Sequence, residues 1–170
     1  MSKQFFLIVT CIVSVYIAAG GMAEAIIYKQ YEIAQTLPES PIVSDQTEYR
    51  NIAEQKAIED QIALYSIYPL NSKLPDSIVY LVTLASFGFI GSLIRILVKS
   101  INSKKKLEAK NIYALSALGS ILGLTSLIIM EILPEFKYEA GSDEMNFAIA
   151  LLLGMFSIEI YNKLKSKIED

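Results

Sequence analysis

The sequence contains no histidine and only one cysteine, and these two shortages exclude several kinds of chemistry. Without histidine there is no imidazole acid or base, no histidine metal ligand and no histidine pH switch. Cys11 cannot form a disulfide within the chain. No glycine-rich phosphate loop, G-x-S-x-G or H-E-x-x-H pattern occurs. We therefore expect a protein that is not an enzyme, with no catalytic residue, no metal site and no cofactor.

Long apolar runs are abundant instead, and four of them organise the chain. The predicted transmembrane helices cover residues 5–27, 77–98, 112–133 and 147–163. At about 1.5 Å of rise per residue, each of the first three is long enough to cross a hydrocarbon core of about 30 Å. The sequence predicts an all-α membrane protein built as a bundle of four transmembrane helices.

Charged residues are sorted between the segments that join these runs. Segment 99–111 is rich in lysine, and the tail at 164–170 adds two more lysines, whereas segments 28–76 and 134–146 are acidic. Lysine and arginine near the ends of spans stay on the cytoplasmic side. We therefore expect both termini and the basic loop 99–111 in the cytoplasm, with segments 28–76 and 134–146 outside it.

Two of the runs have a second interpretation. The first resembles a cleaved signal peptide, because Lys3 precedes the apolar run and Ala23-Glu24-Ala25 matches an A-x-A cleavage pattern. The fourth is free of charge only from Phe147 to Ile158, so a re-entrant or interfacial helix is the alternative to a span. We favour a span, because Tyr161 and the lysines beyond it form a suitable cytoplasmic anchor.

The segment 28–76 is the longest water-exposed part of the predicted topology. Two prolines between Gln35 and Pro41 predict an irregular connection. Asp45 and Glu48 have the spacing of a capping box, which predicts a helix from there to about Tyr65. A segment of this length is too small for a strong core of its own, so we expect it to pack on the helix ends or on a neighbouring subunit.

Small residues are concentrated in the second, third and fourth runs, where they permit close approach of helix backbones. The candidate helix-packing residues are Gly88, Ser92, Gly119, Gly123, Ala150 and Gly154. They fit either a homo-oligomer interface or contacts within a single four-helix bundle, and the sequence leaves both open.

Four charged residues lie inside or at the edge of the apolar runs. Arg95 and Glu159 have similar predicted depth near the cytoplasmic ends, and we expect an intramembrane ion pair or, alternatively, a charged pore mouth. Glu24 and Glu131 lie near the outer ends. In a symmetric oligomer either carboxylate would recur as a ring that attracts cations to a pore, whereas in a monomer both are scattered surface groups.

The basic loop offers a candidate anion site. Its lysines are Lys99, Lys104, Lys105, Lys106 and Lys110. They satisfy the positive-inside rule and suit anionic lipid headgroups. The alternative is a site for a nucleotide or a DNA oligomer, held through its phosphates. No aromatic residue is interleaved with the lysines, so base stacking is not expected.

Two functions of different classes follow. The first is a homo-oligomeric ion channel gated by an anionic cytoplasmic ligand, supported by the small residues, the outer carboxylates and the inner lysines. The second is a structural or assembly subunit that anchors a partner through its outer segment and conducts nothing. A proton-coupled exporter that uses Glu24 ranks below both, because Glu24 is too near the outer boundary for a midplane site.

The layout and the lysines at 99, 104–106 and 110 together resemble a known class of proteins. A short bundle with both termini in the cytoplasm, an outer loop and a lysine-rich inner face is similar to the small membrane effectors of bacterial antiviral defence, in particular the Hailong-type channel effectors. This resemblance implies a tetrameric channel in the bacterial inner membrane. It also implies closure by single-stranded DNA oligomers from a partner nucleotidyltransferase, and opening that depolarises the infected cell.

Overall fold

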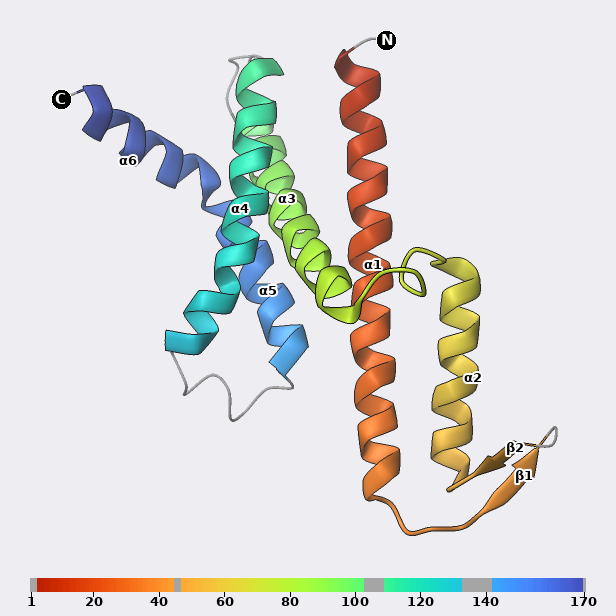
Figure 1. Cartoon of the computed structure of the whole chain (residues 1–170). Coiled ribbons are helices and arrows are strands. Elements are labelled where there is room, and N and C mark those ends of the chain that lie inside the picture. Colours follow the sequence, from red (N-terminus) through yellow and green to blue (C-terminus); the bar gives the residue numbers. More distant parts are fainter. Residues whose placement is uncertain (1–2, 45–46, 103–108, 133–141, 170) are drawn as a thin grey trace. The chain divides into compact units, whose positions relative to one another are not determined.

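A computed structural model describes residues 3–44, 47–102, 109–132 and 142–169, and these are helical except for one small β-hairpin and the segments that connect the elements (Figure 1). In chain order the elements are α1 (Lys3–Thr36), β1 (Ile42–Ser44), β2 (Thr47–Tyr49), α2 (Ile52–Ile67), α3 (Asp76–Asn102), α4 (Ala109–Ile132), α5 (Ser142–Met155) and α6 (Ser157–Glu169). The predicted all-α class is therefore confirmed.

In the described part of the chain, three helices are long and apolar enough to cross a membrane, and they overlap the first three predicted runs. The qualifying stretches are Ile8–Thr36, Asp76–Ile101 and Ile112–Ile129. The α5 and α6 helices meet the same test only when they are taken together as one bent pair. The chain thus has the apolar helices of a membrane protein.

The chain divides into two compact units. The bundle unit comprises Met1–Ala19 and Tyr80–Asp170, and the hairpin unit comprises Gly20–Val79. The first half of α1 belongs to the bundle unit and the second half to the hairpin unit. The two units are described separately below.

The hairpin unit differs from the prediction at the end of α1 and at the start of α2. The α1 helix does not end near Ile27 but continues to Thr36, because Tyr28–Gln35 contains no glycine or proline to stop it. The helix predicted from Asp45 to about Tyr65 is present, but its predicted start is wrong, since Thr47–Tyr49 is a strand paired antiparallel with Ile42–Ser44. The α2 helix begins only at Ile52, where Asn51 provides the cap.

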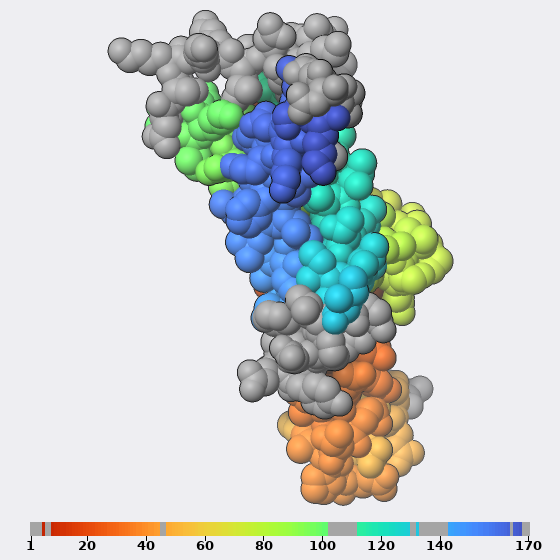
Figure 2. All heavy atoms as spheres, turned by 90° about the vertical axis from the view of Figure 1, so that its left-hand side faces the viewer, coloured from red at the N-terminus to blue at the C-terminus, as the bar shows by residue number. Residues whose placement is uncertain are grey.

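The bundle unit is built on close contact between helix backbones. In Figure 2, α4 and α5 lie side by side within the bundle unit. A β-carbon built on Gly88 of α3 would lie 2.2 Å from the carbonyl oxygen of Gly119 and 2.8 Å from the Cα of Gly123, both in α4. One built on Gly154 of α5 would lie 2.0 Å from the carbonyl oxygen of Gly88. Glycine is required at these positions because any side chain would overlap backbone.

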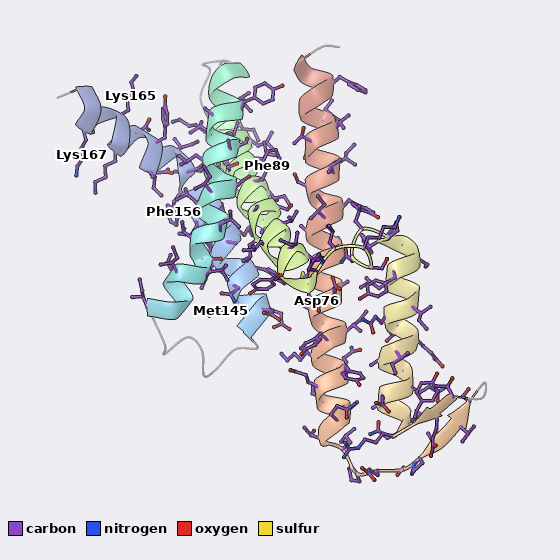
Figure 3. The ribbon with its side chains drawn as sticks, viewed as in Figure 1. Asp76, Phe89, Met145, Phe156, Lys165 and Lys167 are labelled. Carbon is purple, nitrogen blue, oxygen red and sulfur yellow. The ribbon has the colours of Figure 1, made fainter. Side chains whose placement is uncertain are left out.

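The fourth apolar run is divided at Phe156 into α5 and α6, which meet at an angle of 49°. Backbone hydrogen bonding continues through the bend, because the Phe156 amide donates to the carbonyl oxygens of Leu152 and Leu153. Ile158 at the start of α6 is buried against Ile96 and Leu115. Beyond this contact Lys165 and Lys167 project from opposite sides of α6 (Figure 3).

Candidate functional site

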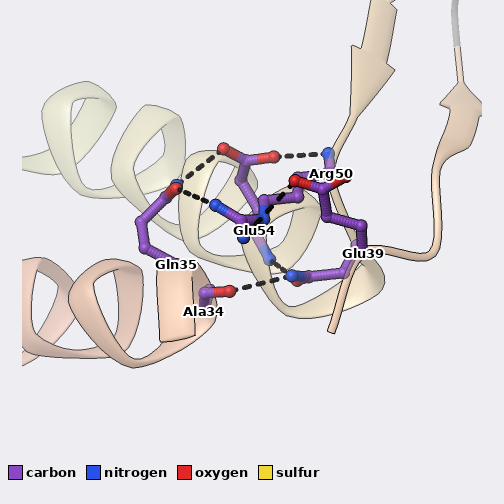
Figure 4. Close-up of polar contacts among 6 residues, drawn as sticks. Ala34, Gln35, Glu39, Arg50 and Glu54 are labelled. Atoms are coloured by element: carbon purple, nitrogen blue, oxygen red, sulfur yellow. Dashed lines mark hydrogen bonds and ion pairs between the residues drawn. The ribbon is translucent and has the colours of Figure 1, made fainter. Parts of the chain in front are cut away.

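Asn51 joins α1 to α2 at one end of the hairpin unit through hydrogen bonds to Ala34 and Glu54, both labelled in Figure 4. Its side-chain oxygen accepts a hydrogen bond from the Glu54 backbone amide at 2.9 Å, which caps the N-terminus of α2. Its Nδ2 donates to the carbonyl oxygen of Ala34 at 2.8 Å, in the last turn of α1. One buried side chain therefore satisfies the end of one helix and the start of the next.

Around this cap lies a charged cluster that closes the same end of the hairpin unit. The Glu54 carboxylate accepts from the Arg50 backbone amide at 2.6 Å and from Gln35 Nε2 at 2.9 Å. The Arg50 guanidinium in turn lies 3.4 Å from Gln35 Oε1 and 3.4 Å from the Glu39 carboxylate. These contacts hold β2 and the connection before β1 against the helix ends.

Glu24 holds the other end of the hairpin unit together. Its carboxylate accepts hydrogen bonds from Asn71 Nδ2 at 2.7 Å and from the Tyr65 hydroxyl at 3.3 Å. Burial raises the pKa of the Tyr65 hydroxyl above its ordinary value, which keeps that hydroxyl protonated and able to donate. Gly20 lies against the Tyr68 ring, which a β-carbon would approach to 2.7 Å. The Glu24 carboxylate is thus engaged within the hairpin unit by two donors.

The outward surface of α2 is more apolar than its charges suggest. Ile52, Ile62 and Ile67 are 72%, 66% and 62% exposed, although α2 also carries Lys56 and Glu59 on its surface. The buried side of α2 is narrow and consists of Ala57 and Leu64. Three large aliphatic side chains therefore remain uncovered on a helix with charged neighbours.

Arg95 and Glu159 are brought together from α3 and α6, where the guanidinium and the carboxylate form an ion pair. Both side chains are partly open, at 42% and 43% exposure, so the pair lies on the surface of the bundle unit. Lys99 lies one turn further along α3 and is also exposed.

The small residues singled out in the sequence meet one another inside the bundle unit. Gly119, Gly123 and Gly154 each lie against the backbone of Gly88. Ser92 faces Gly119, whose β-carbon would lie 2.5 Å from the Ser92 Cβ. Ala150 is fully buried. These residues serve contacts within the chain, although each small residue also fitted an interface between chains when only the sequence was considered.

The rest of the predicted sites lie outside the described residues. This holds for Lys104, Lys105 and Lys106, and also for the side chains of Lys110 and Glu131 on α4.

One groove of about 240 Å³ lies in the bundle unit between α1, α3 and α4. It is lined by Ser14, Leu81, Val82, Ala85, Ser86, Phe89, Ser120 and Leu124. None of these side chains titrates near neutral pH, so the groove offers no acid, base or strong nucleophile. Among the described residues, no group of histidine, cysteine, aspartate or glutamate is arranged to hold a metal ion.

Asn51, Asn71 and Tyr65 were not among the predicted site residues. Asn51 had a sequence signal, because Asn51 and Glu54 have the spacing of a capping box just before a helix. The contacts of Asn71 and Tyr65 with Glu24 join residues that are far apart in the sequence, so no local pattern indicates them. The chain matches no protein-family model, no curated protein and no solved structure.

Proposed function

We propose that the protein is a membrane-anchored assembly subunit that holds its hairpin unit outside the cytoplasm and binds a partner protein through α2. The observation that carries this proposal is the exposure of Ile52, Ile62 and Ile67 on a helix with charged surface residues. Exposed apolar side chains on a water-facing helix favour burial against a partner, because each square ångström of apolar surface removed from water is worth about 25 cal/mol.

Polar residues at one end of the hairpin unit suggest where the membrane boundary lies in the proposed arrangement. Glu24 and its donor Asn71 lie at one end of the hairpin unit, and Lys73 and Asp76 follow directly. Such polar groups are costly in hydrocarbon, so we place them at the headgroup level. Residues 5–23 then span the membrane, with a length of about 28 Å against a core of about 30 Å. This placement leaves α2 and the last three turns of α1 in water.

The charged residues on α2 argue against lipid as the environment of its exposed isoleucines. Lys56 and Glu59 share the outer surface with the exposed isoleucines, and Glu48 and Arg50 lie on the adjoining strand and its end. Burying these charges in hydrocarbon would cost several kcal/mol each. A protein surface with its own polar rim accommodates both kinds of side chain.

An ion channel gated by an anionic ligand is the second candidate. One observation favours it: the Arg95–Glu159 pair stays half-exposed on the surface of the bundle unit, where it could face a path between copies. Backbone contact at Gly88 packs α3, α4 and α5 directly against one another, so the proposed path runs between copies. Lys99, the lysines at 104–106 and Lys110 would then hold the ligand, as the resemblance to Hailong-type antiviral effectors implies.

Ion flux separates the two candidates. The purified full-length chain is reconstituted in liposomes, and potassium flux is followed with and without short single-stranded DNA oligomers. The assembly role predicts no flux under either condition. Flux that depends on the protein and changes in Arg95→Gln would overturn it in favour of the channel.

A second experiment tests the partner-binding face directly. Complexes are extracted from the native membrane in mild detergent and sized by native electrophoresis. We expect Ile62→Lys to remove the largest complex while the chain remains inserted. Thr47→Lys is the matched control, since it adds the same charge at an exposed strand position of the hairpin unit. Equal complexes in both variants would contradict a docking role for α2.

A further inference from the structure

The α1 helix carries a seven-residue repeat whose side chains are exposed in the part of the chain that the structure describes. Residues of the repeat alternate at spacings of three and four, which is the a/d pattern of helices that wind around one another. The a positions are Ile12, Ala19, Ile26 and Ile33. The d positions are Ile8, Val15, Met22 and Lys29. All eight are exposed, and seven of them are apolar.

The second half of this repeat lies on the side of α1 that faces away from α2. Within the hairpin unit, α1 turns Glu24 and Ala34 toward α2 and the residues around it. On a helix of 3.6 residues per turn, Met22, Ile26 and Ile33 fall on a different side. They are 39%, 38% and 53% exposed, and Leu37 just beyond the helix is 41% exposed.

Lipid explains the exposure of the first half of the repeat but not that of the second. Ile8, Ile12 and Val15 fall within the proposed span, where lipid tails cover apolar side chains. Ile26, Ile33 and Leu37 follow Glu24 and fall in water under the proposed placement. From Ile8 to Ile33 the repeat extends about 38 Å along the helix, which exceeds a hydrocarbon core of about 30 Å.

We infer that a second copy of this chain covers this face, so that α1 helices from neighbouring copies associate in parallel. All copies insert into the membrane in the same direction, and identical heptads then meet in register. A 3.5-residue spacing matches a helical partner with the same period. Lys29 is the single charged residue in the repeat and occupies a d position.

This inference goes beyond the proposed docking role, because it assigns a different surface to a different partner. It rests on the proposed placement of the hairpin unit in water, but not on the partner of α2. The face of α1 defined by Met22, Ile26 and Ile33 binds another copy, while Ile52, Ile62 and Ile67 of α2 stay available.

Cysteine crosslinking tests the inference position by position. Because Cys11 is the only cysteine, Cys11→Ser provides a cysteine-free background. Into it we introduce Ile26→Cys or Ile33→Cys, and oxidise native membranes with copper phenanthroline. We expect disulfide-linked dimers from both. Tyr28→Cys is the matched control, since Tyr28 is 59% exposed but lies off the repeat, and we expect at least fivefold less dimer.

Dimer formation that is equal at all three positions, or absent at Ile26 and Ile33, would overturn the inference. A second measurement uses the mass of the intact protein in nanodiscs, which does not depend on oxidation. Ile26→Asp with Ile33→Asp should reduce the assembly to one copy, whereas Ile62→Asp on α2 should leave its mass unchanged. If instead only Ile62→Asp lowers the mass, the copies associate through α2, and both the inference and the separate docking role are wrong.

Discussion

The bundle unit and the hairpin unit hold their helices together by different means. In the bundle unit, Gly88, Gly119 and Gly154 bring helix backbones into direct contact. In the hairpin unit, Asn51 and Glu24 connect α1 to α2 and the following loop through side-chain hydrogen bonds. The first unit depends on the absence of side chains and the second on their polar groups.

The difference is what the proposed placement of the bundle unit in lipid and the hairpin unit in water would produce. In lipid there is no hydrophobic drive between helices, so association depends on close packing and small residues. The described part of the bundle unit even buries the hydroxyls of Ser116, Ser126 and Ser157 without a hydrogen-bond partner. In water, a helical hairpin with only Ala57 and Leu64 buried on α2 has a small core. Hydrogen bonds at both of its ends compensate by fixing the helices against each other.

Adding a methyl group at Gly88 should have the largest effect on stability, because the methyl group would overlap backbone atoms of α4 in the bundle unit. In Gly88→Ala the new β-carbon would lie 2.2 Å from the Gly119 carbonyl oxygen, and α3 and α4 must separate. We expect a loss of about 3 kcal/mol in the free energy of unfolding. Titration with a denaturing detergent in mixed micelles measures it.

The same substitution in the hairpin unit is its control. In Gly20→Ala the β-carbon meets the Tyr68 ring at 2.7 Å, and a side chain can rotate away where backbone cannot. The loss should stay below about 1 kcal/mol, offset by the better helix propensity of alanine. If Gly20→Ala proves as harmful as Gly88→Ala, the contrast between backbone and side-chain packing does not hold.

Replacing Asn51 should have the second largest effect. Asn51→Leu removes the cap of α2 and the bond to the Ala34 carbonyl oxygen, for a loss of about 2 kcal/mol. Asn51→Asp keeps the capping oxygen and loses only the bond to Ala34, so it should cost about half as much. Hydrogen exchange of the α2 amides, read by mass spectrometry on the full chain, reports both. Equal exchange in the two variants would mean that the cap contributes nothing.

The apolar helices were predictable because each is marked by a continuous local signal. The runs beginning at Phe5, Ser77 and Ile112 overlap the three described helices that are long and apolar enough to cross a membrane. The end of α1 was missed because hydropathy falls after Ile27 while helix-forming residues continue to Thr36. Hydropathy measures the solvent that a segment prefers, and it does not mark where a helix stops.

The hairpin unit was less predictable because its contacts join distant positions. Asp45 and Asn51 both had a capping-box spacing to a glutamate three residues later, and only the strand pairing of Thr47–Tyr49 decides between them. Likewise Glu24 was expected either to face solvent or to line a pore. Its two donors come from residues 41 and 47 positions away, which no local pattern indicates.

Neutralising Glu24 should have a moderate effect that also separates a structural carboxylate from a conducting one. Glu24→Gln keeps one acceptor oxygen and replaces the other by an amide N–H donor. The two donors Asn71 and Tyr65 then no longer have one acceptor oxygen each. We expect a loss of about 1 kcal/mol in unfolding free energy, and Tyr65→Phe should lose less. Double substitution should cost less than the sum of the two, since the groups contact each other. A change in ion flux without any loss of stability would instead assign Glu24 to a pore.

The ion pair between Arg95 and Glu159 should give the smallest effect, although it is the most obvious charged contact in the bundle unit. Both side chains are nearly half-exposed, and pairs open to solvent contribute about 0.5 kcal/mol. A double-mutant cycle of Arg95→Gln and Glu159→Gln in mixed micelles isolates this coupling. A coupling above about 2 kcal/mol would show that the pair is shielded from water, as it would be if α6 were held against another copy or buried in lipid. A small coupling that falls further in high salt would place it at the membrane surface, where the glycine contacts and not the charges hold α3, α4 and α5 together.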